Sequence, residues 1–119
     1  MNILNVDDSM TMRKIVTLAL KGQGHTVLEA ENGKLALDIL PTQPIDAIIL
    51  DINMPVMNGI EFLQAIKKLP VFTKIPIIVL TTQGEDALKD QALSLGAKAF
   101  MIKPFQKDDL LATLKKICP

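Results

Sequence analysis

The sequence predicts a single α/β domain in which helices cover both faces of a parallel β-sheet. Short apolar runs alternate with amphipathic stretches about five times along the 119 residues. The central runs, "AIIL" and "PIIVL", are continuously apolar, which is typical of strands buried on both faces. Hydrophobic residues make up 49% of the chain, so a chain of this length can bury one substantial core. We therefore expect one domain spanning residues 1–119, with right-handed crossovers between parallel strands.

The apolar runs give the strands in order. We expect strands over residues 3–6, 26–28, 45–50, 77–80 and 99–102. Each run has the length of an ordinary strand, and each is followed by polar residues or by glycine and proline.

The stretches between these runs have helical spacing and recognisable ends. The first, "SMTMRKIVTLALKGQG", begins with a capping Ser9 and closes at Gly22 and Gly24. The others are "NGKLALDILP", which stops at Pro41, "NGIEFLQAIKKLP", which stops at Pro70, "GEDALKDQALSLG", which stops at Gly96, and "KDDLLATLKKICP". Strand and helix patterns thus alternate throughout, with no linker or low-complexity segment between them.

Composition excludes several classes of protein. Thirteen basic residues balance thirteen acidic ones, which argues against electrostatic nucleic-acid binding. No apolar run approaches the roughly 18 residues of a membrane span, and the N-terminus lacks a signal-peptide pattern. The single cysteine, Cys118, permits no intrachain disulfide and fits a reducing cytoplasm. With only one histidine, His25, a zinc site is not expected, and we expect a cytoplasmic monomer.

Polar side chains follow four of the predicted strands. Asp7 and Asp8 follow the first strand, Asp51 the third, Thr81 and Thr82 the fourth, and Lys103 the fifth. In an open parallel sheet, ligands bind beyond the carboxyl ends of the strands, at a switch point in strand order. We therefore expect three carboxylates, a hydroxyl and an ammonium group to converge on one pocket.

This set of groups suits metal-dependent phosphoryl chemistry. Three carboxylates at close quarters require a cation, and all-oxygen ligands favour Mg²⁺. Asp7 and Asp8 are then half of a Mg²⁺ site, and Asp51 shares the metal and acts as the nucleophile that forms an acyl phosphate. Lys103 would neutralise charge on the transferred group, and the Thr81 hydroxyl would donate to it. The plainer alternative is that Asp7 or Asp8 only caps the following helix.

The motifs "VDDS", "LDINMPVMNG", "VLTT" and "AFMIKPF" occur in the order and at the spacing of response-regulator receiver domains. The chain resembles this family over residues 3–117, and within it the single-domain chemotaxis regulators. The resemblance implies a flavodoxin-like (βα)5 fold of three layers, with a five-stranded parallel sheet of order 2-1-3-4-5. It also implies that Asp51 is the phosphoacceptor and that Asp7 and Asp8 are the acidic metal pair.

The resemblance assigns further roles. The backbone carbonyl of Asn53 would complete the metal shell, and Thr81 and Phe100 would form the switch. The peptide bond before Pro104 is expected to be cis. Asn53 and Gln83 lie two residues beyond Asp51 and Thr81, so we expect them to tune the lifetime of the phosphoryl group.

The resemblance also implies partners. A sensor histidine kinase would donate the phosphoryl group, and a protein such as a flagellar motor switch protein would read the change. Two features depart from chemotaxis regulators: Phe100 replaces the usual tyrosine or tryptophan, and "GED" at residues 84–86 does not match the motor-binding pattern. Because the sequence ends straight after the last helical pattern, we expect no output domain. The alternative is a phosphate sink, or a receiver that relays phosphoryl groups to another protein.

Two other α/β classes fit less well. An aspartate-nucleophile phosphohydrolase would carry "DxDGT" after the first strand, where this chain has "DDSM". A flavodoxin-like redox or nucleotide-binding module would need a phosphate-cradling loop there, and no GxGxxG or P-loop occurs. We therefore expect a phosphoacceptor switch with self-catalysed phosphorylation and dephosphorylation and not a classical enzyme.

Overall fold

The computed structural model describes residues 1–118, and Pro119, the last residue of the predicted domain, lies outside the described residues. Strands and helices alternate as β1 (Asn2–Val6), α1 (Met10–Lys21), β2 (Thr26–Ala30), α2 (Gly33–Ile39), β3 (Ala47–Leu50), α3 (Gly59–Lys67), β4 (Ile77–Thr81), α4 (Asp86–Ser94), β5 (Ala99–Ile102) and α5 (Lys107–Ile117). Within residues 1–118, no helix has both the length and the apolar character needed to cross a membrane.

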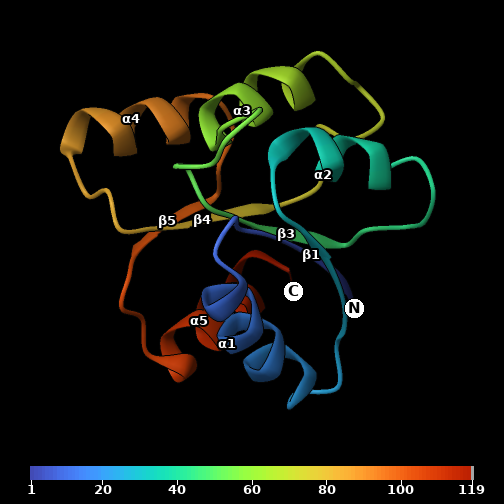
Figure 1. Cartoon of the computed structure of the whole chain (residues 1–119), viewed down its shortest axis with the longest axis vertical. Coiled ribbons are helices and arrows are strands. Elements are labelled where there is room, and N and C mark those ends of the chain that lie inside the picture. Colours follow the sequence, from blue (N-terminus) through green and yellow to red (C-terminus); the bar gives the residue numbers. More distant parts are fainter. Residues whose placement is uncertain (119) are drawn as a thin grey trace.

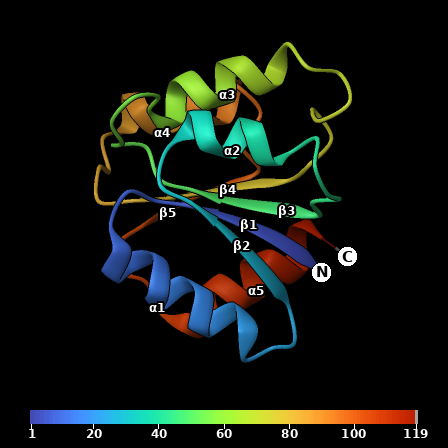
Figure 2. The same ribbon diagram turned by 45° about the vertical axis from the view of Figure 1, so that its right-hand side comes forward.

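The molecule has three layers. Its strands form one parallel sheet in the order β2-β1-β3-β4-β5. Helices α1 and α5 lie on one face of the sheet, and α2, α3 and α4 lie on the other (Figure 1; the same layers are seen from a second side in Figure 2). The predicted fold class and strand order are confirmed.

Successive side chains of each strand pack alternately into two hydrophobic cores, one on each face of the sheet. Leu4 and Val6 of β1 pack in the cluster under α2, α3 and α4. Ile3, one position away, packs in the cluster under α1 and α5. Because β3 and β4 are buried at every position on both faces, their sequences read as continuously apolar.

Four strand boundaries differ from the prediction, two of them by one residue (β1 begins at Asn2 and β4 ends at Thr81) and two by two residues. The expected start of the third strand at residue 45 is wrong by two positions, although Ile45 is buried. Asp46 lies between, where its N–H donates to the Asn2 carbonyl (2.7 Å) and its carboxylate accepts from the Asn2 N–H (2.8 Å). Strand β2 continues past the predicted residue 28 to Ala30, because its last residues pair with the end of β1.

The helix ends follow local capping. The Ser9 hydroxyl accepts from the Met12 N–H at 3.2 Å, so the predicted cap of the first helix is present. Asn58 and Glu61 form a reciprocal capping box at the start of α3. This second cap fixes where the loop after β3 ends, and that loop borders the site described next.

Candidate phosphoacceptor and metal site

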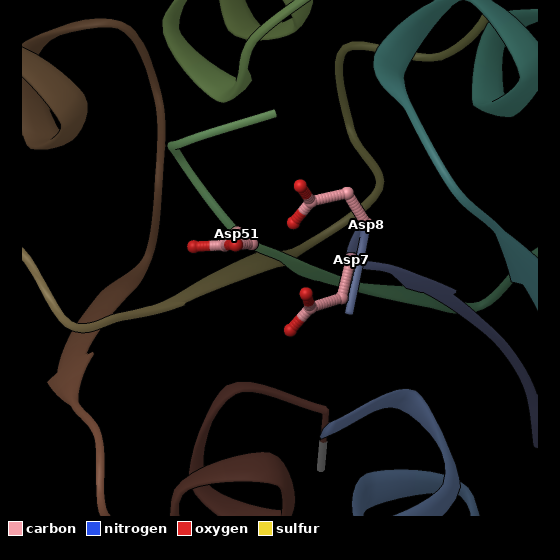
Figure 3. A group of neighbouring side chains, drawn as sticks. All are labelled: Asp7, Asp8 and Asp51. Carbon is pink, nitrogen blue, oxygen red and sulfur yellow. The ribbon is translucent and has the colours of Figure 1, made fainter. Parts of the chain in front are cut away.

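The acidic residues meet because β1 and β3 are neighbours in the sheet. Val6 pairs with Leu50, so Asp7 and Asp51 leave the sheet side by side. The Asp51 N–H donates to the Val6 carbonyl at 2.9 Å, which continues the ladder by one residue. Figure 3 shows the carboxyl groups of Asp7, Asp8 and Asp51 directed to the same side.

Asp7 is buried and held at both carboxylate oxygens. Its Oδ1 accepts from the Ser9 N–H at 2.9 Å, and its Oδ2 accepts from the Lys103 ammonium at 2.6 Å. The side chains of this ion pair are only 5% and 7% exposed. Removal of either partner would leave an uncompensated buried charge, which is costly.

Asp51 is buried as well, but among the described residues only one of its two carboxylate oxygens accepts a hydrogen bond. Its Oδ1 accepts from the Ile52 N–H at 2.8 Å, and its Oδ2 lies 3.8 Å from the Lys103 ammonium. Burial raises the pKa of the Asp51 carboxyl above its usual value, and the negative charge of Asp7 acts in the same direction. The Lys103 ammonium opposes both and lowers this pKa, but burial is the larger effect. The loss of solvation that raises the pKa also leaves the carboxylate weakly solvated, as a nucleophile should be.

The three carboxylates form a set that could hold a metal ion. One oxygen from each of Asp7, Asp8 and Asp51 lies within 4.8 Å of the others. Asp8 is exposed, so an ion could keep water ligands on that side. An all-oxygen set of carboxylates with room for water fits Mg²⁺ by the chemistry of its donors. Asn53 is exposed and lines the same pocket, as a contributor of a backbone carbonyl should.

A pocket of about 630 Å³ opens over these groups. Its wall consists of Asp7, Asp8, Ser9, Met12, Ile15, Asp51, Asn53, Thr82, Lys103, Pro104 and Phe105. The Lys103–Pro104 peptide bond in this wall is cis. The wall thus combines the acidic residues with the apolar side chains of Met12 and Ile15 from α1 and of Phe105 from the loop before α5.

Thr81 is not on the pocket wall. It is fully buried at the end of β4, and its hydroxyl accepts from the Gln83 N–H at 3.2 Å. That hydroxyl still lies close enough to Asp51 to lower the pKa of the carboxyl slightly. Thr82, its neighbour, is exposed and lines the pocket. Phe100 of β5 lies farther away, half-buried against the core under α2, α3 and α4.

The loop after Asp51 approaches the strand end very closely. A Cβ built on Gly59 would lie 2.8 Å from the Ile52 Cα and would overlap the Asp51 carbonyl oxygen. In the same loop Val56 has φ +67°, and the Met57 N–H donates to the Pro55 carbonyl at 2.7 Å, which makes a γ-turn. Only glycine at position 59 allows this loop to close against the strand.

Arg13 is the residue of this region that the sequence analysis missed. Its guanidinium Nη1 donates to the Asp7 carbonyl at 2.6 Å, and its Nε donates to Glu29 Oε1 at 3.0 Å. The sequence gives little signal for these contacts, since Glu29 lies 16 residues away from Arg13, on strand β2. The apolar pocket residues Met12 and Ile15 were missed too, because at helical spacing they read as core.

Comparisons with known proteins find relatives over nearly the whole chain. A family model described as the response regulator receiver domain matches residues 3–115. A chemotaxis protein CheY homolog of Campylobacter jejuni is 39% identical over 119 residues, covering 98% of this chain and 92% of that protein. The phosphate regulon transcriptional regulatory protein PhoB of Pseudomonas aeruginosa is 38% identical over 115 residues, covering 97% of this chain but only 50% of that protein. This chain thus spans half the length of one relative and nearly all of the other.

Solved structures show the same likeness. The chemotaxis protein CheY4 of Vibrio cholerae superimposes with a TM-score of 0.91 at 36% identity, covering 98% of this chain and 97% of that one. A CheY-like receiver domain protein from Methanospirillum hungatei superimposes with a TM-score of 0.87 at 28% identity, covering 97% and 90%. The match therefore extends over the full set of strands and helices that carries the acidic site.

Proposed function

This chain belongs to the response regulator receiver domain family, and from that premise we propose that it is a stand-alone receiver whose Asp51 accepts a phosphoryl group from a histidine kinase. The observation that carries the proposal is the buried Asp51 carboxylate, beside two further carboxylates and within 3.8 Å of the Lys103 ammonium. The Campylobacter jejuni chemotaxis protein, which matches this chain over 92% of its own length, supports the proposal.

The transfer is a substitution at phosphorus. An Asp51 carboxylate oxygen attacks the phosphorus carried on the imidazole of the kinase, the P–N bond breaks, and its electron pair returns to the imidazole, which takes up a proton. Asp7, Asp8, Asp51 and the backbone carbonyl of Asn53 would hold Mg²⁺, which supplies positive charge to the phosphoryl oxygens. Asp51 must be ionised to attack, and its raised pKa shifts that requirement to higher pH.

Lys103 is placed to respond to the new charge. Its ammonium lies 2.6 Å from Asp7 Oδ2 and 3.8 Å from Asp51 Oδ2. A phosphoryl group on Asp51 adds negative charge on the more distant side of this ammonium. Lys103 is therefore expected to shift from Asp7 toward the phosphoryl oxygens and to stabilise the acyl phosphate.

The signal would leave through Thr81 and Phe100. The Thr81 hydroxyl accepts a hydrogen bond from the Gln83 N–H, and its own proton is free to donate to a phosphoryl oxygen. Movement of Thr81 changes the space beside β5, where Phe100 is half-buried. A local charge change would thus bias a two-state side chain on the face formed by α4, β5 and α5. Asn53 and Gln83, next to the site, would tune the lifetime of the phosphoryl group by controlling the approach of water.

We further propose a cytoplasmic, monomeric regulator that acts in chemotaxis by binding a protein target such as a flagellar motor switch protein.

A second candidate is a phosphate sink or a relay to another protein. The comparable identities to the chemotaxis protein (39%) and to PhoB (38%) favour keeping this candidate, since the likeness does not select one output. Phosphorylation-dependent binding to a purified motor switch protein supports the first; its absence, with transfer of the phosphoryl group to a second protein, supports the other.

The central experiment is phosphorylation by a small phosphodonor. Incubation with Mg²⁺ should add one phosphoryl group, seen as a mass increase of the intact protein, and peptide mapping should place it on Asp51. Asp51→Asn should not gain the group at that site, and a chelator should block the reaction. The proposal is contradicted if the protein is phosphorylated equally well in the presence of chelator. It is also contradicted if Asp51→Asn gains the group on the same peptide.

A further inference from the structure

Arg13, in the first turn of α1, joins two elements beside the acidic site. Its guanidinium Nη1 donates to the main-chain carbonyl of Asp7 at 2.6 Å, and its Nε donates to Glu29 Oε1 of β2 at 3.0 Å. The Arg13 side chain is only 13% exposed. The guanidinium thus uses two separate nitrogens of a rigid, planar donor fork at once, whereas an ammonium group donates from a single nitrogen.

The contact at the carbonyl fixes a peptide plane. The Asp7 carbonyl belongs to the peptide that joins Asp7 to Asp8, and that peptide is planar. On the other side of Asp7, its N–H donates to the Ala30 carbonyl at 3.1 Å. The main chain of Asp7 is therefore held on both sides, and the direction in which Asp8 leaves the turn is set by the plane that Arg13 holds.

The orientation of the Asp8 side chain depends more on this contact of Arg13 than that of Asp7 does. Both carboxylate oxygens of Asp7 have partners of their own, the Ser9 N–H and the Lys103 ammonium. Asp8 is exposed, and within residues 1–118 no hydrogen bond orients its side chain. Its contribution to the set of three carboxylates therefore depends on the main chain that precedes it.

The helix that carries Arg13 is itself anchored. The side-chain amide of Asn5, buried in β1, donates to the Arg13 carbonyl at 3.1 Å and to Thr17 Oγ1 at 3.2 Å. The Arg13 main chain is thereby tied to the same strand that delivers Asp7. The guanidinium starts from a fixed point, which is what a positioning group requires.

We propose that Arg13 is a positioning residue for the metal ligands Asp7 and Asp8: by holding their shared peptide plane, it sets the affinity of the acidic cluster for a divalent cation. The inference deepens the proposed function and rests on it. Glu29 completes the arrangement, because its carboxylate neutralises a guanidinium that would otherwise repel the cation.

Charge and geometry predict opposite results for removal of Arg13. If the guanidinium acts only as a nearby positive charge, its removal strengthens the binding of Mg²⁺. If it positions the ligands, its removal weakens binding, since partners of metal-ligand residues typically contribute 10–100-fold to metal affinity. The sign of the change therefore decides between the two.

The test compares Arg13→Met, Arg13→Lys and the control Val16→Ala in the whole protein. Mg²⁺ alone is titrated by calorimetry, and amide hydrogen exchange at Ser9 is measured in the metal-free protein by NMR, since that N–H donates to Asp7 Oδ1. Arg13→Met should weaken Mg²⁺ binding about tenfold and speed exchange at Ser9. Arg13→Lys, which keeps the charge but not the fork, should give an intermediate loss.

Val16→Ala removes buried apolar atoms on the same helix, in the core under α1 and α5, and Val16 takes no part in the contacts of Arg13. It should lower the melting temperature and leave both Mg²⁺ affinity and Ser9 exchange unchanged. The inference is overturned if Arg13→Met binds Mg²⁺ as tightly as the parent or more tightly, or if Val16→Ala loses the same affinity. A parent protein that fails to bind Mg²⁺ contradicts the proposed function itself, a separate outcome from an unchanged Arg13→Met.

Discussion

At the scale of single residues, the site holds more negative charge than its own cations balance. Asp7 takes the Lys103 ammonium at 2.6 Å, and Asp51 is left at 3.8 Å from it. Burial raises the pKa of the Asp51 carboxyl, so keeping this group ionised costs free energy in the folded, metal-free protein. Because Lys103 lies closer to Asp7, the negative charge of Asp51 is the less neutralised of the two. An added cation would therefore stabilise Asp51 more than Asp7.

This cost leads to a pH-dependent prediction for Asp51→Asn. Because the folded-state pKa is raised above the usual value of 3.8, the folded protein holds the proton more tightly than the unfolded chain does. Stability from this group therefore falls as pH rises from 3.8 through the folded-state pKa, and the cost is fully present above it. Asp51→Asn should raise the melting temperature by a few degrees at pH 7 in chelator.

The same variant has two built-in controls. Below pH 3.8, where the parent carboxyl is protonated in both states, the gain should disappear. With saturating Mg²⁺ it should shrink or reverse, since the parent binds the ion more tightly than the variant does. Thermal unfolding followed by circular dichroism measures all three conditions, and equal melting temperatures at neutral pH in chelator would refute the argument.

The residues of the site differ in how far the sequence reveals them. Asp7, Asp8, Asp51 and Lys103 could be placed together because each follows a strand, and carboxyl ends of parallel strands share one edge. Arg13 could not, because its contacts are to a carbonyl and to a distant glutamate, and neither leaves a pattern in sequence. The buried position of Thr81, with Thr82 on the pocket wall, depends on the exact end of β4 and was equally out of reach.

At the scale of elements, the loop between β3 and α3 shows the tightest packing near the site. Gly59 begins α3, and its Cβ position is occupied by main-chain atoms of Asp51 and Ile52. Main-chain atoms cannot move aside as a flexible side chain can. Gly59→Ala should therefore displace the strand end that carries Asp51 and cost about 1–3 kcal/mol of unfolding free energy, as over-packing does.

A matched control for Gly59→Ala exists in the same chain. Gly22 caps α1 with φ −60°, and its nearest new contact would be 3.4 Å from the Leu18 carbonyl oxygen, an ordinary distance. Gly22→Ala should be neutral or slightly stabilising, and should leave phosphorylation unchanged. Chemical denaturation and phosphorylation rate are measured for both variants; equal behaviour would show that the loop tolerates a side chain at position 59.

Predictions of whole elements succeeded where local signals agreed and failed where tertiary contacts decided. Ser9 and the glycines after α1 fixed that helix, because caps are local. The start of β3 was placed too early, since the apolar Ile45 read as strand while Asp46 is engaged by Asn2 from another strand. The γ-turn at Val56 has no signal in sequence, because a valine is a poor candidate for positive φ.

At the scale of the whole molecule, the site and the proposed output face lie at different parts of one sheet. Phe100 is half-buried against the core beneath α4, while the acidic cluster lies at the strand ends. We predict that Phe100→Ala accepts the phosphoryl group normally but loses the phosphorylation-dependent gain in partner affinity, because the bulky group that would change position is absent. Phe100→Tyr should retain the gain, since its ring fills the same space.

Partner affinity with and without a phosphoryl mimic measures this coupling. Thr81→Ala is the second variant to test. It should still be phosphorylated, but its partner affinity should rise little on phosphorylation, because it lacks the hydroxyl that would move toward the phosphoryl group. If Phe100→Ala keeps the full gain in affinity, the ring is only core filling, and transmission runs through the loop after Thr81.

The ion pair between Lys103 and Asp7 joins residues 96 positions apart. During translation, all three carboxylates leave the ribosome long before the ammonium that balances them, and β5 must pair with β4 before that ammonium can reach its place. A nascent chain therefore holds these carboxylates without the ammonium that balances them until the last strand is made. A chain that stops before β5 would lack the only cation that the site's own side chains, in the part of the chain that the structure describes, supply to Asp7 and Asp51.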